Sequence, residues 1–358
     1  MGDQEGNSLI QTEEPPPKTR PQGRLLNVEG VGPDKIVYNL SRPFSLDGKT
    51  YHAARSDRRE VVNEGTDSQT IFLQEKDGVL FWDDSAPTFD RLQDPQVAVL
   101  RKPRSSLSRK EPEYQILVSG VMPFPRPTQK YPNGLSYRTI FFLGDNLQNL
   151  DYLVESPDRM KDMPVEQLSD DSIVLFTRPE IEIPLDDGDS EWKRHIRYIR
   201  LESVYDLPHT DFRGGKELSG IFDGIKYWGG TDAVFELGNG CWGLLVHKGH
   251  EPIKNLKKRY IECFCVVDPE SAAFTRPELY VERSDFPKSG VRIMPDKPED
   301  YLQDVVFCCG GRRNNDGTLT SWYGLSDHSP GVITAPDPFV LYETLPKDQI
   351  FDVVAPEK

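Results

Sequence analysis

Residues 233–246 read Ala233-Val234-Phe235-Glu236-Leu237-Gly238-Asn239-Gly240-Cys241-Trp242-Gly243-Leu244-Leu245-Val246, two largely apolar runs on either side of an Asn-Gly pair. Such a pair supplies the positive φ angle that a tight hairpin turn requires. The same arrangement recurs at Asp47-Gly48, Asp77-Gly78 and Asp316-Gly317. The pattern predicts that antiparallel hairpins are the repeating unit of the chain.

Strand-like runs continue through the rest of the sequence, at 114–121, 137–143, 172–177, 195–202, 260–267 and 304–309, and helical periodicity is almost absent. So many short antiparallel strands must hide their edges, and a propeller does this by radial repetition around a channel. At about 40–50 or more residues a blade, five blades fit the chain. We therefore expect an all-β, five-bladed β-propeller, with a pair of β-sandwiches as the alternative, and this expectation rests on strand density because no fixed-period repeat is visible.

The domain organisation is expected to be simple. Residues 1–24 contain Glu13-Glu14-Pro15-Pro16-Pro17 and few apolar side chains, which indicates a disordered N-terminal tail. No later composition shift separates a second domain, so 25–358 is expected to be one propeller domain. Four stretches rich in proline, serine or charge are expected to be long surface loops, namely 102–112, 125–134, 156–170 and 284–300.

Composition excludes several classes of partner. The net charge of −15, from 43 basic and 58 acidic residues, repels polyanions, so we expect no nucleic-acid binding. No apolar run reaches the roughly 18 residues of a membrane span, and residues 1–24 lack the apolar stretch of a signal peptide. The five cysteines have no CxxC spacing and lie in apolar runs, which predicts buried free thiols. Together these features predict a cytoplasmic protein without membrane contact.

Asp94 is the carboxyl whose setting suits an acid catalyst, in Leu92-Gln93-Asp94-Pro95-Gln96-Val97. Pro95 restricts the preceding residue to extended or turn conformations, and a buried strand follows. A carboxyl held where a strand enters the core can have its pKa raised by burial and donate a proton. Taken alone, the same residues also fit an ordinary turn Asp before a strand.

Other strand ends carry cations and further polar groups. They occur in 38–55, in 173–179, in 226–249 and in 305–327. Strands that radiate from one axis can bring such groups into one funnel, where arginine is suited to grip phosphate in bidentate fashion.

The ordered set of these segments resembles the five-bladed propellers of glycoside hydrolase family 130 and, more closely, domain-of-unknown-function family 1861, which overlaps glycosyltransferase family 108. The resemblance covers roughly residues 30–335. Two departures are visible. Gln96 stands where the Asp-Pro-Arg motif has arginine, and Lys248 separates His247 from Gly249 where the family reads Tyr-His-Gly.

The resemblance implies roles for individual residues. Asp94 matches the general acid. The implied sugar-binding residues are Asn39, Ser41, Arg55, Gln93, Tyr323 and Asp327, the last two in a Tyr-Gly-x-x-Asp motif. The implied phosphate-binding residues are Arg178, Arg200, Lys226 and His247, with Arg197 as the alternative to Arg200.

The resemblance also implies a reaction. Inorganic phosphate would attack a β-mannoside with inversion, the implied linkage being β-1,2, and the reverse reaction would use mannose 1-phosphate or GDP-mannose. No cofactor is expected, and no metal, because no cluster of ligands at metal spacing is present. Related enzymes often form dimers, so a homodimer is an open expectation.

Two alternatives to this phosphorylase or mannosyltransferase remain open. A hydrolase on the same scaffold would need a carboxylate base, for which Glu180, Glu182 and Glu202 are candidates. A non-catalytic propeller that binds carbohydrate or protein would use the same strands, because one fold hosts many functions.

Overall fold

The computed structural model describes residues 20–60, 67–102, 113–126, 134–184, 190–253 and 256–351. Within these ranges the regular structure is β-strand apart from α1 (Lys347–Phe351) and three 3-10 helices, Leu147–Asn149, Val204–His209 and Arg283–Asp285. The all-β class is therefore confirmed. Most of the predicted N-terminal tail, residues 1–19, lies outside the described residues, as do 103–112 and 127–133 of two predicted loops.

Four of the sheets have four antiparallel strands each, and three of these follow chain order or nearly so. The first contains β9 (Gln93–Arg101), β10 (Tyr114–Pro125), β11 (Leu135–Gly144) and β12 (Asp151–Glu155), and the second contains β13 (Val165–Gln167), β14 (Ile173–Thr177), β17 (Arg197–Leu201) and β18 (Lys216–Glu217). The third contains β19 (Trp228–Glu236), β20 (Trp242–Ile253), β21 (Lys257–Val267) and β22 (Glu278–Val281). The fourth contains β23 (Val306–Arg313), β24 (Thr318–Leu325), β25 (Ser329–Pro336) and β1 (Arg24–Leu25).

A larger sheet and a small hairpin complete the structure. The larger sheet has seven strands, β2 (Asn27–Glu29), β3 (Lys35–Tyr38), β4 (Phe44–Leu46), β5 (Lys49–Arg58), β6 (Gln69–Lys76), β7 (Val79–Trp82) and β8 (Phe89–Asp90). The hairpin pairs β15 (Glu180–Pro184) with β16 (Ser190–Arg194).

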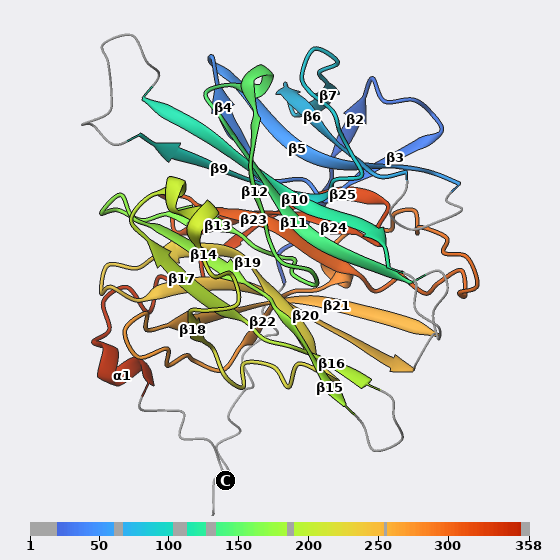
Figure 1. Ribbon diagram of the computed structural model, residues 1–358. Coiled ribbons are helices and arrows are strands. Elements are labelled where there is room, and N and C mark those ends of the chain that lie inside the picture. The colour runs from blue at the N-terminus through green and yellow to red at the C-terminus, as the bar shows by residue number, and fades with distance from the viewer. Residues whose placement is uncertain are drawn as a thin grey trace, which may run out of the picture.

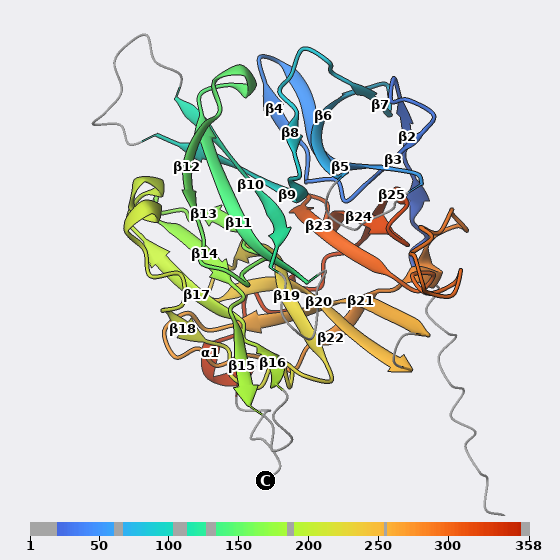
Figure 2. The ribbon, with the colours of Figure 1, turned by 45° about the vertical axis from the view of Figure 1, so that its right-hand side comes forward.

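The sheets are arranged around a common centre in a propeller-like manner (Figures 1 and 2). The ring is closed by the N-terminal strand β1, which pairs with β25 and so completes the sheet formed by the last strands of the chain. This closure protects the open edge of β25, as a ring of sheets requires. The predicted propeller-like arrangement is thus confirmed, whereas the count of five blades stays a prediction.

The hairpins form where the turn residues predict them. At Asp47-Gly48 both residues have positive φ, 49° and 73°, and the turn joins β4 to β5. Asp77-Gly78 does the same between β6 and β7, with φ of 51° and 77°. At Asn239-Gly240 only the glycine has positive φ, because the connection between β19 and β20 is longer.

The core lies between neighbouring sheets. Phe176, Tyr198 and Trp242, for example, pack with ring centroids 5.2–6.2 Å apart. All five cysteines are buried and free, as predicted.

The prediction that 156–170 forms a surface loop is wrong. Met160 and Met163 are 0% and 1% exposed, and β13 begins at Val165. These apolar side chains pack between two sheets, which draws the whole segment inward.

Five chain segments run past the centre, each from an axial channel to a second and more apolar cavity, and four of them also line a polar cavity before they reach the channel. The polar cavity has a volume of about 340 Å³ and is lined by Asn39, Asp94, Asp162 and Phe307 among others. Further along the chain from these residues lie the channel residues, which include Arg42, Gln96, Pro164, Asp232 and Cys309. The second cavity, of about 770 Å³, begins where the channel ends and includes Phe44, Val99, Leu168, Phe235 and Arg313.

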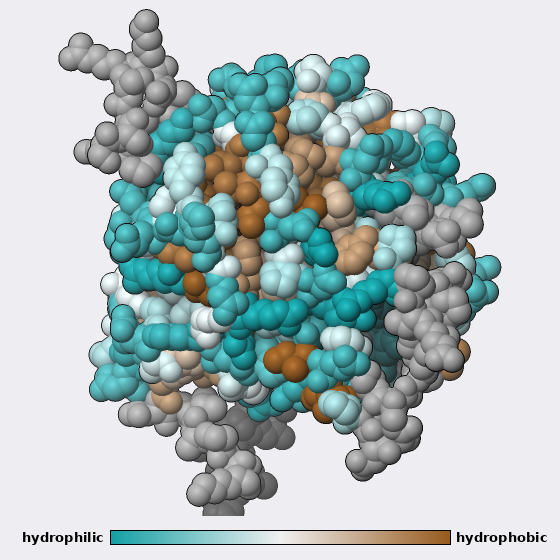
Figure 3. All heavy atoms as spheres, in the orientation of Figure 1, coloured by the Kyte–Doolittle hydropathy of each residue, from teal (hydrophilic) through white to brown (hydrophobic). Residues whose placement is uncertain are grey.

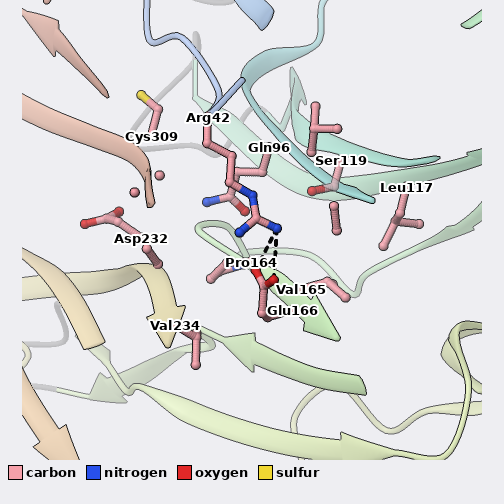
Figure 4. A pocket seen from close by; sticks show the side chains of 15 residues that line it. Arg42, Gln96, Leu117, Ser119, Pro164, Val165, Glu166, Asp232, Val234 and Cys309 are labelled. Atoms are coloured by element: carbon pink, nitrogen blue, oxygen red, sulfur yellow. Dashed lines mark hydrogen bonds and ion pairs between the residues drawn. The ribbon is translucent and has the colours of Figure 1, made fainter. Parts of the chain in front are cut away.

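The axial channel is crossed by an ion pair. Arg42 Nη2 lies 3.0 Å and 2.8 Å from the two carboxylate oxygens of Glu166, and Figure 4 shows the two side chains pointing toward each other. The two cavities are therefore separated by a polar constriction at the centre of the molecule.

The face of the molecule drawn in Figure 3 is mostly hydrophilic, with hydrophobic residues gathered in its upper half, over the region of β4, β9 and β12 in Figure 1. Among the described residues, no helix has the length and apolar character needed to cross a membrane.

Candidate active site

The polar cavity collects charged side chains from all parts of the chain. Its lining includes three carboxylates, Asp94, Asp162 and Asp327, and five basic or titratable partners, Arg55, Lys161, Arg178, His247 and Lys258. These side chains come from segments far apart in the sequence, and the propeller-like arrangement brings them to one end of the axial channel. A water-accessible cavity with convergent charges has the general features of a catalytic site.

Asp94 stands at the start of β9 and is held through one oxygen. Its Oδ1 accepts a hydrogen bond from Asn39 Nδ2 at 2.6 Å and one from Arg55 Nη1 at 3.1 Å. The side chain is 20% exposed, so the burial expected from the sequence is only partial. Two donors on one oxygen fix the orientation of the carboxyl and leave Oδ2 as the oxygen that a substrate can meet.

Arg55 is itself anchored in a buried network. Its Nε and Nη2 donate to the two oxygens of Asp57 at 3.1 Å and 3.0 Å. Tyr38 and Arg292 also bind Asp57 Oδ2, at 2.7 Å and 2.9 Å. Burial acts to raise the pKa of Asp57, but Arg55 and Arg292 outweigh it and lower that pKa to about 2. Asp57 therefore stays ionised and locks Arg55 in place.

Four of the residues that line the cavity adopt the left-handed backbone region: Asn39, Asp94, Asp162 and Asp327, with φ of 50°, 49°, 53° and 48°. Asn and Asp tolerate this region better than other residues with a side chain, but it remains costly and gathers at functional sites. In each case the turn directs a short polar side chain into the cavity instead of along a strand. Asp94 thus takes the turn conformation, not the extended one, of the two that Pro95 suggested.

A glycine makes room for Asn39. A Cβ on Gly324 would lie 1.6 Å from Asn39 Oδ1, which no real contact allows. The glycine of the Tyr-Gly-x-x-Asp motif therefore permits the close approach of Asn39, which in turn binds Asp94.

The cavity lining also holds Arg178 and His247, with Asp162 between them. Arg178 Nη1 lies 2.5 Å from Asp162 Oδ2, and His247 Nε2 lies 3.5 Å from the same oxygen. His247 Nδ1 donates to Asp232, whose oxygens are 2.8 Å and 3.0 Å away. Burial acts to lower the pKa of His247, but the Asp232 and Asp162 carboxylates outweigh it and raise that pKa. The shift favours the protonated ring, whose Nε2–H faces Asp162.

Tyr260 adds a polarised hydroxyl beside His247. Its ring stacks on His247 with centroids 5.7 Å apart, and Trp228 Nε1 donates to its hydroxyl at 3.1 Å. Burial would raise the pKa of Tyr260, but the charges of Lys258, Lys161 and His247 lower it to about 8. The group of cations around Tyr260 thus favours negative charge at this end of the cavity.

The structure brings together seven of the eleven residues that the sequence predicted. They are Asp94, Asn39, Arg55, Gln93, Asp327, Arg178 and His247, all in the lining of the polar cavity. Burial raises the pKa of Asp327, although the nearby Lys258, Arg55 and Arg292 act against that rise.

Two of the predicted sugar-binding residues lie in the packed interior instead. Ser41 accepts from the Ala53 backbone and donates to the Arg42 carbonyl, both at 2.9 Å. Tyr323 is fully buried among core residues, with its hydroxyl accepting from Ser321 at 2.9 Å. Neither side chain lines the cavity, because each faces the sheet neighbour that packs against it.

Two of the predicted phosphate-binding residues lie on the surface. Arg200 is half exposed and pairs with Asp170, while Ser172 accepts from its Nε at 3.0 Å. Lys226 is exposed, with its Nζ 5.2 Å from the Tyr227 ring. Arg197 is bound to Glu217 at 2.8 Å and does not line the cavity either. None of these three side chains lines the polar cavity.

The three candidate bases for hydrolysis are also absent from the cavity lining. Glu180 is buried but paired with Arg194 at 2.9 Å, and both Glu182 and Glu202 are exposed. In the described part of the chain, no group of three or more His, Cys, Asp or Glu is placed to hold a metal ion.

Sequence reasoning missed Asp162, Lys161, Lys258 and Tyr260, which line the same cavity. Asp162 carried a usable signal, since Asp162-Met163-Pro164 precedes β13 much as Asp94-Pro95 opens β9. Without knowledge of the sheets around it, the charged segment that contains Asp162 is predicted to be a surface loop. Tyr260 and Lys258 carried none, because nothing local shows which face of β21 meets the axis.

The chain matches the model of a family described as protein of unknown function, DUF1861, over residues 17–341. No curated protein sequence matches it. Among solved structures it is similar to MPT-4, a mannose phosphorylase from Leishmania mexicana in complex with phosphate ion, with 24% identity and a TM-score of 0.71 over 94% of this chain and 93% of that one.

Two further structures share the fold. MPT-1, a GDP-Man-dependent mannosyltransferase from Leishmania mexicana, is 21% identical with a TM-score of 0.70, over 92% of this chain and 93% of that one. A β-1,2-mannobiose phosphorylase from Listeria innocua is 15% identical with a TM-score of 0.55, over 90% and 95% of the two chains. At these identities the likeness establishes a common fold.

Proposed function

The chain belongs to the DUF1861 family, and on this premise we propose that it is an inverting β-mannoside phosphorylase or mannosyltransferase. The observation that carries the proposal is that Asp94 lines the same cavity as Arg178 and His247. The substrate class is a β-linked, in particular β-1,2-linked, oligomannoside with phosphate, mannose 1-phosphate or GDP-mannose. The mannose phosphorylase and the mannosyltransferase of the same fold support this choice.

Asp94 is assigned as the general acid. In phosphorolysis a phosphate oxygen forms a bond to C1 of the mannosyl unit while the bond from C1 to the glycosidic oxygen breaks, and the proton of Asp94 goes to that oxygen. The products are mannose 1-phosphate with inverted configuration and a shortened acceptor. In the reverse reaction Asp94 takes the proton back as a base. The two donors on Oδ1 support Oδ2 as the reacting oxygen.

Phosphate is the nucleophile in this reaction. Because it already carries negative charge, the site needs no second carboxylate to activate it. Arg178 and His247 are assigned to bind and orient it, with Lys161 and Lys258 completing the positive environment and Tyr260 contributing a hydroxyl group. Fixed cations in a cavity of restricted solvent access balance the charge that builds up in the transition state.

The sugar is assigned to the space between these two ends, next to Asn39, Gln93 and Asp327. These amide and carboxylate side chains can pair with hydroxyl groups, which supports a sugar as the ligand of this space.

We extend the proposal to the architecture. The seven-stranded sheet is interpreted as the fifth blade, and residues 25–358 as one catalytic domain. Support comes from the five chain segments that pass the axis in the same order, one from each large sheet or its edge.

The test is release of mannose 1-phosphate from β-1,2-mannobiose with and without phosphate. For Asp94→Asn, which cannot supply the proton, we expect a rate about 10² to 10⁴ lower than for the unchanged protein. The matched control is Asp84→Asn, an exposed turn residue, which should keep the full rate. A fully active Asp94→Asn would remove the acid assignment.

The same assay separates the other functions. A rate that does not change with phosphate indicates hydrolysis, which none of Glu180, Glu182 and Glu202 is placed to support from the cavity lining. Tight binding of oligosaccharide in calorimetry, with no turnover of mannobiose, mannose 1-phosphate or GDP-mannose, indicates a binding protein.

A further inference from the structure

Asp162 places a carboxylate inside the group of cations that would hold phosphate. Its Oδ2 lies between Arg178 Nη1, at 2.5 Å, and His247 Nε2, at 3.5 Å. All three side chains are at most 4% exposed. Asp162 Oδ2 accepts no hydrogen bond of good geometry from a described residue. Because Oδ2 lies within 3.5 Å of both nitrogens, an anion that binds Arg178 and His247 comes close to the carboxylate of Asp162.

The position of Asp162 is built into the fold. Its backbone is in the left-handed region, with φ of 53°, between the buried residues Met160 and Met163. Across the sheet boundary, a Cβ on Gly230 would lie 2.8 Å from Asp162 Cβ and 2.8 Å from His247 Cε1. The absence of a side chain at Gly230 thus lets Asp162 sit against His247, and there is little space into which the carboxylate can retreat.

Asp162 stays ionised in this setting. Burial acts to raise its pKa, but the positive charges of Arg178, Lys161 and His247 outweigh burial and hold the pKa below its usual value. An ionised carboxylate accepts hydrogen bonds and donates none. It repels a fully ionised oxyanion and attracts one that still carries an O–H group.

We propose that Asp162 selects protonated oxyanions, accepting a hydrogen bond from the P–O–H group of inorganic phosphate while Arg178 and His247 bind its ionised oxygens. Phosphate retains at least one such proton near neutral pH, whereas sulfate, of similar size and charge, retains none. No covalent bond changes in this step, and the proton stays on phosphate. The inference rests on the proposed function, because it assigns phosphate to this end of the cavity.

The selection also bears on the product. A phosphate monoester loses its second proton with a pKa of about 6, so mannose 1-phosphate is mostly a dianion without P–O–H at neutral pH. Facing Asp162, that dianion lacks the hydrogen bond that phosphate makes. The Asp162 carboxylate thereby favours the release of mannose 1-phosphate and the binding of a new inorganic phosphate.

The experiment is calorimetric titration of the full chain with four oxyanions at matched ionic strength. Phosphate and arsenate carry a proton near neutral pH, and sulfate and selenate do not, so the set separates protonation from size. We expect the protonated pair to bind at least about tenfold more tightly than the other pair, because a buried like-charge contact is costly. This comparison needs no variant, so it holds even if a substitution prevents folding.

In Asp162→Asn the amide can donate as well as accept, so the difference between phosphate and sulfate should fall to about twofold or less. Sulfate should then inhibit phosphorolysis competitively. The control is Asp171→Asn, which changes an exposed aspartate that also has positive φ, at 70°. It should keep the selectivity of the unchanged protein.

Equal affinity of the unchanged protein for all four anions would overturn the inference, as would full selectivity in Asp162→Asn. Neither result would affect the proposed function if phosphate still drives release of mannose 1-phosphate. If the unchanged protein releases mannose without phosphate and Asp162→Asn does not, Asp162 acts as a base for hydrolysis, and both the inference and the proposed function are overturned. Absence of any phosphate binding would do the same.

Discussion

Arg55 holds the carboxylate of Asp94 with one nitrogen and a buried anchor with the other two. Nη1 lies 3.1 Å from Asp94 Oδ1, while Nε and Nη2 grip Asp57, which is fully buried. The orientation of a partly exposed carboxyl is thereby transmitted from the packed interior of the seven-stranded sheet. A site on a rigid strand holds its geometry better than one on a loop.

Replacing Arg55 by lysine should keep the charge and lose the fork that binds two carboxylates at once. We expect kcat for phosphorolysis to fall about 10²-fold, because Asp94 loses its orientation. The free energy of unfolding should fall by about 1–3 kcal/mol, because Asp57 keeps fewer partners. Steady-state kinetics and urea unfolding measure the two effects. Arg59→Lys, an exposed arginine on the same strand end, is the control, and equal behaviour of the two variants would contradict the anchoring role.

Arg178 and Arg200 form a matched pair for the phosphate assignment, since only the first lines the cavity. For Arg178→Lys we expect the KM for phosphate to rise about tenfold or more, because a bidentate, charge-assisted contact is lost. Arg200→Lys should change neither KM nor kcat. Initial rates over a range of phosphate concentrations give both values. If Arg200→Lys raises the KM and Arg178→Lys does not, the assignment from the cavity geometry is wrong.

Gly324→Ala tests the support of Asn39. The added Cβ would lie 1.6 Å from Asn39 Oδ1, so Asn39 must turn away and release Asp94. We expect a loss of about 1–3 kcal/mol in the free energy of unfolding and a large fall in activity. Adding Asn39→Ala should restore much of the stability, because the clash is removed, without restoring activity. Gly238→Ala, whose Cβ would meet Glu343 Oε2 at 3.1 Å and the Glu343 carbonyl oxygen at 3.6 Å, should be close to neutral in both assays.

Acid should weaken the network around Asp57. Its pKa is lowered from 3.8 to about 2 in the folded protein, so its contribution to stability is present above about pH 4 and is lost as the pH falls toward 2. A shift of this size corresponds to about 2 kcal/mol. In urea unfolding between pH 5 and 2, Asp57→Asn should therefore start less stable and lose less with acid than the unchanged protein. Parallel pH profiles of the two proteins would show that Asp57 is not the group that titrates.

Much of the local structure could be predicted from short stretches of sequence. Asp47-Gly48 and Asp77-Gly78 form tight turns because positive φ is cheap only for such residues, and apolar runs on both sides then pair as strands. The buried thiols follow from cysteines within apolar strands in the same way. The prediction of a surface loop at 156–170 was wrong because it rested on the charged residues of the segment. The burial of Met160 and Met163 depends on sheets formed by other parts of the chain.

For the candidate site, the residue pattern together with the family resemblance singled out Asp94, Arg178 and His247, which line one cavity. It did not distinguish Arg178 from Arg200, nor reveal Asp162 and Tyr260 as their neighbours. Those outcomes depend on which face of each strand meets the axis and on which sheet lies beside it. Turns and strands follow from interactions between residues close in the chain, whereas the convergence of charges comes from packing between sheets, which only the tertiary structure determines.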